Sequence, residues 1–475
     1  MSNFREKMLN NISALAKKMQ PFFYGAYFPA YVAMITALFY FLDLAIVGLF
    51  VYAVFACLTL VLYEDLTPFI PLPVCVLAMF KSFDAFSNVL TYVPLVFIFI
   101  ALVLHFVLYP IKRITKGKLY LPLIIVTFAL FVGGFFAPYM SRYGGAIVSM
   151  VAVGPLVLFI YFLFTTYVKP PEKFDFAKHV AYVLTLFGVL CAIETFYYKY
   201  CRVTNNPIVD VISVGWSNIG WSNINAVATC LLICMPACCY LLVRTGCVKS
   251  CLTALLAMYV AMYFTNSEAC LGISVVFLPI SVIFMLLKSN DRIRKQLIII
   301  SFIVIILGLI AFAFILTKTS IIALVTKLFT ELMDDTSRSK MYRMGLELFS
   351  KYPIFGVGLH FVPEEYWITV DAVFAFNFHS SFFHILATMG IVGIVAFTFY
   401  YVRRYQILTQ NYGAYNTFAF LSFTIMEIYA MIDTCEFNVM PIMLIVTILL
   451  VSVEKLNNKS NEQPLPLFKR RIKFN

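Results

Sequence analysis

The chain has 475 residues, of which 62% are hydrophobic and only 12% are charged, and its formal net charge is +12. Soluble globular domains carry about 25% charged residues, so this composition excludes a soluble enzyme and indicates an integral membrane protein. Its apolar runs are long enough to cross about 30 Å of hydrocarbon as helices, and they lack the alternation expected of barrel strands.

The first segment, residues 1–21, is basic and carries Arg5, Lys7, Lys17 and Lys18. A signal peptide would place a small-residue cleavage site after a short apolar core, and none follows here. The segment is therefore predicted to lie on the cytoplasmic membrane surface ahead of the first span.

Residues 22–453 are predicted to form one transmembrane bundle of about fourteen helices, followed by a basic cytoplasmic tail, 454–475. Lysine and arginine are concentrated in alternate short loops, so the positive-inside rule places both termini in the cytoplasm. The tail is predicted to contact anionic lipid. The positive charge thus follows the membrane topology and does not indicate a nucleic-acid partner. The predicted spans are 22–41, 44–62, 67–80, 89–110, 120–139, 145–166, 180–198, 226–243, 251–265, 270–287, 297–317, 380–402, 416–432 and 439–453.

Cysteines are unusually frequent within the predicted spans. Cys230, Cys234 and Cys238 recur every four residues and so share one helix face. No histidine or carboxylate completes a metal shell there, so they are interpreted as small apolar residues and no metal site is predicted. Cys201 and Cys435 both fall on the predicted outer side, where they could form a disulfide, although the sequence does not give their separation.

One predicted outer segment is rich in flat rings and amides: Trp216, Asn218, Trp221, Asn223 and Asn225. Sugars stack their apolar faces on aromatic rings and bind amides through their hydroxyls. The same residue types also form the aromatic belt at a membrane interface. Sugar binding and interfacial anchoring are both open for this segment.

The long outer segment 318–378 is the largest polar stretch of the chain. Residues 319–332 are predicted to form an amphipathic surface helix, and residues 338–350 a second short helix. Pro353 ends the second helix because the residue before a proline avoids helical geometry. Gly356 and Gly358 are interpreted as a turn.

The second helix carries three candidate binding residues. Arg338 and Tyr342 share a face, and Arg343 lies about 140° around from Arg338. Guanidinium groups bind phosphate oxygens bidentately and keep their charge, which favours a diphosphate ligand. The alternative is a pair of solvated surface arginines.

His379 stands where the outer segment re-enters apolar sequence. Imidazole titrates near physiological pH, so His379 is a candidate proton acceptor at the interface; the alternative is a structural histidine, as predicted for His384. Glu194 and Glu427 lie within or near spans, where ionisable groups are costly and tend to be functional or paired. The sequence identifies no partner for either one.

These motifs together resemble the signature of the O-antigen ligase and polysaccharide polymerase family. The resemblance rests on Arg338-x-x-x-Tyr342, then Tyr352-Pro-Ile-Phe-Gly-Val-Gly358, then His379 followed by Met389-Gly-Ile-Val-Gly393, with a weaker upstream match at 215–226.

Two positions depart from the family pattern. Ser380 replaces an asparagine, and Glu268 replaces an arginine expected to help hold diphosphate. Arg202 or Arg142 are candidates to substitute for that arginine.

The resemblance implies a GT-C-like, all-α polytopic protein of the bacterial cytoplasmic membrane. It implies a metal-independent glycosyltransferase without cofactor, acting outside the cytoplasm on an undecaprenyl-diphosphate-linked glycan. In this scheme His379 orients or deprotonates the acceptor hydroxyl, and Arg338 and Arg343 bind the diphosphate. A chain-length regulator or flippase of the same pathway is the expected protein partner. The number of predicted spans favours a polymerase; a ligase and a lipid-linked oligosaccharide flippase are the alternatives.

Overall fold

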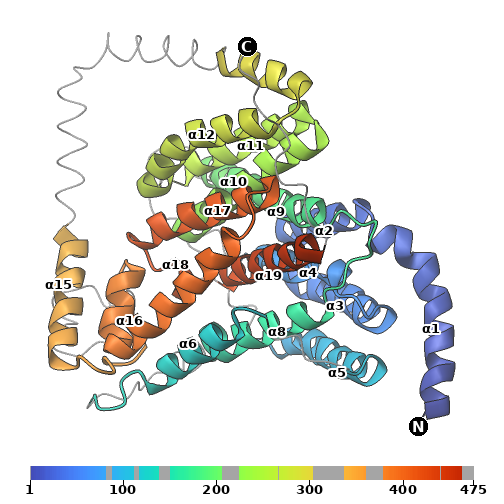
Figure 1. Ribbon diagram of the computed structural model, residues 1–475, viewed down its shortest axis with the longest axis horizontal. Coiled ribbons are helices and arrows are strands. Elements are labelled where there is room, and N and C mark those ends of the chain that lie inside the picture. Colours follow the sequence, from blue (N-terminus) through green and yellow to red (C-terminus); the bar gives the residue numbers. More distant parts are fainter. Residues whose placement is uncertain are drawn as a thin grey trace.

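The computed structural model describes residues 2–81, 88–111, 117–137, 150–205, 224–265, 267–302, 336–359, 378–438 and 440–462. Every regular element within these ranges is a helix (Figure 1), which confirms the all-α prediction. Residues 291–302 are also helical. The named helices are α1 (Ser2–Phe23), α2 (Tyr27–Leu42), α3 (Ala45–Leu62), η1 (Thr67–Phe69), α4 (Pro71–Cys75), η2 (Val76–Met79), η4 (Val89–Thr91), α5 (Tyr92–Leu108), α6 (Tyr120–Val132), η5 (Ala152–Leu156), α8 (Val157–Tyr167), α9 (Phe176–Asn205), α10 (Ile224–Thr245), α11 (Val248–Phe264), α12 (Glu268–Lys288), α15 (Thr336–Lys351), α16 (Ser381–Leu408), α17 (Ala414–Ala430), α18 (Cys435–Asn438) and α19 (Met440–Glu462).

The described helices are those of a multi-pass membrane protein. By length and composition, six of them can cross a membrane, or up to seven if one bent pair counts as a single span. Four further apolar helices have 10–17 residues, fewer than the roughly 20 residues of a standard span. The number of fourteen spans stays a prediction, and the predicted surface helix at 319–332 lies outside the described residues.

Helix α1 extends away from the bundle at its right edge in Figure 1. The chain bends by 72° between Ile12–Phe23 and Tyr27–Leu42. Lys17 and Lys18 are exposed, while Ile12 packs against the hydrophobic core. This polar and apolar division suits a helix that lies along a membrane surface, and the position of residues 1–21 on the cytoplasmic surface stays a prediction.

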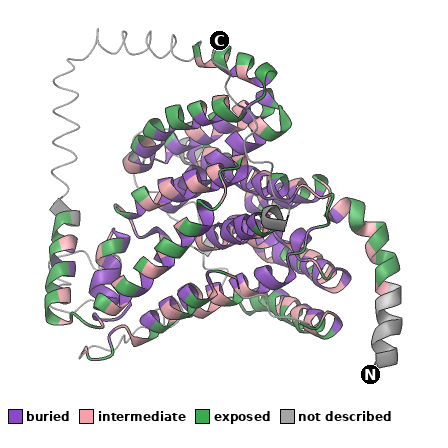
Figure 2. Cartoon of the chain, in the orientation of Figure 1, coloured by how far each residue is buried: buried purple, intermediate pink, exposed green. Residues whose placement is uncertain are grey.

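Helix α10 occupies the centre of the bundle, where it packs against α9, α11, α12 and α17. All of its side chains from Ala226 to Leu242 are buried, so it is coloured almost wholly purple in Figure 2. Cys230, Cys234 and Cys238 are therefore core residues, as the sequence suggested, because a thiol packs like a small apolar side chain.

Peripheral helices expose large apolar side chains in place of polar ones. On α5, Val96, Phe97 and Phe99 are at least half exposed, and on α12 Val275 and Val276 are exposed by 62% and 61%. Figure 2 shows the outer faces of both helices in green. Such a surface is unfavourable in water and suits contact with lipid chains.

The α16–α17 hairpin is fixed to α19 by a buried amide. The Asn457 side-chain oxygen accepts hydrogen bonds from Asn416 (2.9 Å) and Asn411 (3.2 Å), and its nitrogen donates to the carbonyl of Ile407 (2.9 Å). Asn457 is fully buried, and leaving a buried amide unsatisfied is costly. These bonds set the positions of α16 and α17, whose far ends carry the candidate site.

Helix α16 is not one continuous helix, because Gly390 has φ 62° and ψ −150°. The break frees the carbonyls just before it. The Ala387 carbonyl accepts a hydrogen bond from the amide of Val357 (2.9 Å), and the Thr388 carbonyl accepts one from the amide of Gly358 (2.9 Å). Residues 353–358, the turn segment, thus occupy the gap.

The amides just after the break are satisfied by the same turn segment. Ile391 donates to the carbonyl of Pro353 (2.9 Å), and Val392 donates to the carbonyl of Ile354 (3.2 Å). Four backbone hydrogen bonds therefore join the turn segment to the broken helix. Residues 381–408, which contain most of the span predicted at 380–402, are long and apolar enough to cross a membrane, and the break divides them into 381–389 and 391–408. The first part packs against α15, and the second runs into the bundle (Figure 1).

Two glycines make this close contact possible. Gly356 has φ 63°, and a Cβ on it would lie 2.4 Å from the Thr388 carbonyl carbon. A Cβ on Gly390 would lie 2.6 Å from the carbonyl oxygens of Pro353 and Ile354. Only glycine adopts such conformations at little cost and lets two backbones approach this closely. The turn predicted at Gly356-x-Gly358 is confirmed, and its partner is the helix break.

A small apolar cluster, separate from the main core, lies above this junction. Met344 and Leu348 of α15 meet Val357 of the turn segment, together with Phe378 and Ala387. A Cβ on Gly345 would be 3.3 Å from the Phe378 ring. The cluster fixes α15 against the start of α16, which is where His379 lies.

Candidate active site at the start of α16

His379 has an unusual backbone conformation. Its φ is 45°, and among the described non-glycine residues only Asp43 shares a positive φ. Left-handed geometry in a residue with a Cβ costs about 1–2 kcal/mol, and such strain is commonly found at functional sites. Buried Phe378 and buried Ser380 flank His379 and hold it in place.

A carboxylate from another helix faces the imidazole ring. His379 Nδ1 lies 3.5 Å from Asp433 Oδ1, and the two side chains are 17% and 15% exposed. Asp433 follows the end of α17, so α16 and α17 together bring the two groups to the same end of the bundle. At 3.5 Å, the two atoms lie at the outer limit of hydrogen-bond distance.

Asp433 is held as an anion. Its Oδ1 accepts a hydrogen bond from the Thr434 amide (2.7 Å), and its Oδ2 accepts one from the Tyr429 hydroxyl (3.2 Å). Burial raises the pKa of Asp433, but His379 and these two donors outweigh burial, so the pKa lies below its ordinary value. A charged carboxylate here favours the imidazole tautomer with its proton on Nδ1, which leaves Nε2 as the basic nitrogen.

Tyr342 joins α15 to His379. Its hydroxyl donates a hydrogen bond to the carbonyl of His379 (3.1 Å), and its ring stacks on Phe383 with centroids 4.5 Å apart and planes at 14°. The side chain predicted to bind substrate therefore contacts the predicted proton acceptor.

The two candidate arginines lie on the same short helix, which confirms the helix predicted at 338–350. Position 338 is four residues before Tyr342 and so shares its face, while the Arg338 side chain lies outside the described residues. Arg343 is exposed to solvent. Tyr342 is therefore the α15 residue seen to contact His379.

The other predicted sugar- and phosphate-binding residues lie mostly outside the described residues. This holds for Trp216, Asn218, Trp221, Asn223 and Arg142, and for the side chain of Arg202. The side chain of Glu268, where the family pattern has an arginine, also lies outside the described residues. Asn225 lies in the first turn of α10, where its carbonyl accepts a hydrogen bond from the Thr229 hydroxyl (2.8 Å).

Helices α10 and α12 meet next to Tyr429, whose hydroxyl donates to Asp433. The Cys270 thiol on α12 lies against the side chains of Thr229, Ser267 and Tyr429. All twelve cysteines are free thiols, so the disulfide considered between Cys201 and Cys435 is not present.

Glu427 has the partner that the sequence did not identify. It forms an ion pair with Arg404, which is fully buried. The Arg404 guanidinium also lies about 5 Å from three aromatic rings: 5.0 Å from Tyr400, 4.8 Å from Tyr401 and 4.9 Å from Phe423. Glu194 is fully buried in α9. These charges lie inside the bundle, apart from the His379–Asp433 pair.

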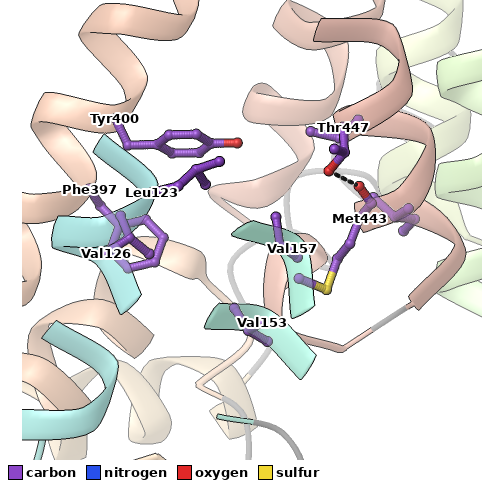
Figure 3. Close-up of a pocket in the computed structure, with 10 residues that line it drawn as sticks. Leu123, Val126, Val153, Val157, Phe397, Tyr400, Met443 and Thr447 are labelled. Atoms are coloured by element: carbon purple, nitrogen blue, oxygen red, sulfur yellow. Dashed lines mark hydrogen bonds between the residues drawn. The ribbon is translucent and has the colours of Figure 1, made fainter. Parts of the chain in front are cut away.

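An apolar pocket lies elsewhere in the bundle, between α6, α8, α16 and α19 (Figure 3). Tyr400 and Thr447 are its polar lining residues, and the Thr447 hydroxyl donates to the Met443 carbonyl (2.8 Å). The cavity volume of about 40 Å³ holds a few water-sized groups, which is too small for an oligosaccharide. The His379–Asp433 pair is not part of this pocket.

Taken together, the site offers one basic nitrogen aligned by a carboxylate, at an end of a membrane-embedded bundle. Such a pair can accept a proton from a hydroxyl nucleophile. Within the described ranges there is no group of three or more histidine, cysteine or acidic side chains arranged to hold a metal ion.

Sequence reasoning missed Asp433 and Tyr429. Asp433 is a single carboxylate directly after a predicted span. This position next to the end of a span is the sequence feature that could have identified it as a site residue. No spacing rule connects it to a histidine 54 residues earlier.

Residues 253–398 match the family model described as O-antigen ligase. The match contains His379 and both sides of the Gly390 break, and it confirms the resemblance that the sequence motifs indicated. A search of the curated proteins found no match.

Proposed function

From the O-antigen ligase family domain at residues 253–398, we propose that this protein is a membrane glycosyltransferase. It joins undecaprenyl-diphosphate-linked oligosaccharide units on the outer face of the bacterial cytoplasmic membrane, as a polysaccharide polymerase. The observation that carries this proposal is the His379–Asp433 pair, with 3.5 Å between Nδ1 and Oδ1, in a chain that otherwise offers lipid an apolar surface.

In the proposed reaction an acceptor sugar hydroxyl attacks the anomeric carbon of the donor glycan. His379 Nε2 takes the hydroxyl proton as the new C–O bond forms. The bond from the anomeric carbon to the diphosphate oxygen breaks, and its electron pair leaves with the lipid diphosphate. Asp433 stabilises the imidazolium that results, as a carboxylate does beside a catalytic histidine.

Arg338 and Arg343 are proposed to bind the departing diphosphate. A fixed positive charge stabilises the developing negative charge at the transition state, and guanidinium forks match phosphate oxygens. This assignment makes the reaction metal-independent. The two arginines are about 140° apart around α15. They can therefore bind one diphosphate only if that ligand wraps around the end of the helix.

The proposed orientation places both termini in the cytoplasm and His379 on the outer side. The expected location is the bacterial inner membrane, with the long segment 318–378 exposed outside. A chain-length regulator or a flippase of the same pathway is the proposed protein partner. Trp216, Asn218, Trp221, Asn223 and Asn225 stay proposed sugar contacts.

A ligase is the second candidate, because the matching family model is described as O-antigen ligase. A ligase passes the glycan to a different acceptor, using the same proton transfer and the same leaving group. The distinction therefore lies in the acceptor that binds beside His379.

Surface glycan from cells lacking the protein decides between these functions. Single repeat units on the surface indicate a polymerase, long chains that are not attached indicate a ligase, and cytoplasmic accumulation of lipid-linked units indicates a flippase.

The same assay tests the site. At normal membrane abundance, His379→Ala is expected to reproduce the deletion phenotype, and Asp433→Asn to shorten the glycan because the reaction is slower. Asp291→Asn, which changes a carboxylate that is 90% exposed, serves as the control. Normal glycan length with His379→Ala would refute the assignment.

A further inference from the structure

The feature that carries a further inference is the contact between Tyr342 and the backbone of His379. His379 holds φ 45°, a conformation that needs support from its surroundings. Support on one side comes from Asp433, which faces the ring at 3.5 Å. On the other side, the Tyr342 hydroxyl donates to the His379 carbonyl at 3.1 Å.

We propose that Tyr342 is a positioning residue that fixes the backbone of His379 so that its imidazole points at the acceptor hydroxyl. The hydrogen bond sets the direction of the 379 carbonyl, and this direction defines the peptide plane leading into α16. The α16 helix starts directly afterwards, with the His384 amide donating to the Ser380 carbonyl (2.9 Å). The inference rests on the proposed catalytic role of His379.

The surroundings of Tyr342 favour positioning over sugar binding. One face of its ring is covered by Phe383, at 4.5 Å and nearly parallel, so that face cannot stack on a sugar. Its hydroxyl is already engaged with the protein backbone. The hydroxyl and the ring of Tyr342 thus both contact the start of α16 and the residue just before it.

The position of Tyr342 is itself fixed by the contacts of α15 with the apolar cluster and the turn segment. Neighbouring Met344 and Leu348 belong to the small apolar cluster with Phe378, and the turn segment ties the end of α15 to the broken α16 through four backbone bonds. Movement of α15 would therefore be transmitted to His379 through the Tyr342 hydroxyl.

The test is Tyr342→Phe in the full-length protein, which removes the hydroxyl and keeps the ring stack. Tyr352→Phe is the matched control, because Tyr352 packs against the same apolar cluster. The assay uses purified protein in lipid vesicles and lipid-linked oligosaccharide isolated from cells lacking the protein. Expected results are a kcat about tenfold lower and an unchanged KM, with only the small loss of Tm that one missing hydrogen bond causes.

A double variant separates positioning from substrate binding. If Tyr342 acts through His379, adding Tyr342→Phe to His379→Ala causes no further loss of residual activity. A second variant, Phe383→Leu, removes the stack that aims the hydroxyl and is expected to lower kcat in the same direction.

Three outcomes would overturn the inference: unchanged kcat in Tyr342→Phe, a raised KM with kcat unchanged, or an undiminished Tyr342→Phe effect in the His379→Ala background. Full activity of His379→Ala is a different result, since it would refute the proposed function itself.

Discussion

The junction between the turn segment and the broken α16 gives a sharp test of how the site is built. In Gly356→Ala, the new Cβ would lie 2.4 Å from the Thr388 carbonyl carbon and 2.5 Å from the Ala387 oxygen. Contacts this short force the two backbones apart. The left-handed conformation at position 356, with φ 63°, adds a further cost for alanine.

The free-energy cost of Gly356→Ala at the junction is the sum of a conformational cost and the loss of hydrogen bonds. Alanine in the left-handed region costs about 1–2 kcal/mol, and losing two of the four junction hydrogen bonds costs about 1 kcal/mol each. The total of about 3–4 kcal/mol corresponds to an opening equilibrium increased about 10²- to 10³-fold. Gly390→Ala is expected to behave alike, since its Cβ would lie 2.6 Å from two carbonyl oxygens.

Hydrogen exchange measured by mass spectrometry on the purified protein is the assay. Peptides covering 353–358 and 387–392 are expected to exchange faster in both variants, while peptides from α10 stay protected. Gly413→Ala is the matched control, because Gly413 has φ −66° and no atom lies within 4 Å of its added Cβ. If Gly356→Ala and Gly413→Ala exchange alike, the junction does not hold the turn segment.

Three further predictions concern charge and topology. Asp433→Asn is expected to slow the reaction and move the acid limb of its pH–rate profile to lower pH, because the imidazolium loses its anionic partner. Glu427→Gln is expected to destabilise the protein by about 3–5 kcal/mol, since it leaves Arg404 as a buried charge without its anion, and thermal unfolding measures this. In intact cells, a membrane-impermeant thiol reagent is expected to label Glu365→Cys and not Cys247, an exposed thiol in a loop predicted to be cytoplasmic.

Each of these has its own contrary result. If the acid limb of the pH–rate profile does not move in Asp433→Asn, Asp433 does not influence the pKa of the base. The lowered pKa of Asp433 means that its stabilising contribution is present above about pH 4 and is lost as pH falls through that pKa, so unfolding at neutral pH must also respond to the substitution. A double variant with leucine at both Arg404 and Glu427 is the comparison. If it is destabilised as much as Glu427→Gln, the unpaired charge of Arg404 is not the cause of the lost stability. Labelling of Cys247 in intact cells would invert the proposed orientation.

Local sequence patterns predicted the helices well because each pattern acts within one element. The helix at 338–350 and its end before Pro353 follow from helical spacing and proline geometry, and the structure has α15 at Thr336–Lys351. The buried cysteines of α10 were likewise predicted by periodicity. The break at Gly390 inside the span predicted at 380–402 was not predicted, because a single glycine does not by itself reveal a break. The break is stable only with the turn segment hydrogen-bonded into it.

By itself the sequence determined that the chain is a helical membrane protein and that His379 is the candidate base, because hydropathy and motif spacing are properties of neighbouring residues. Only the tertiary structure decided that Asp433 faces this base and that Tyr342 holds its backbone. It also decided that Glu427 is paired with Arg404. Side chains from separate helices meet through packing of the whole bundle, and no rule of spacing along the chain encodes where two helix ends come together.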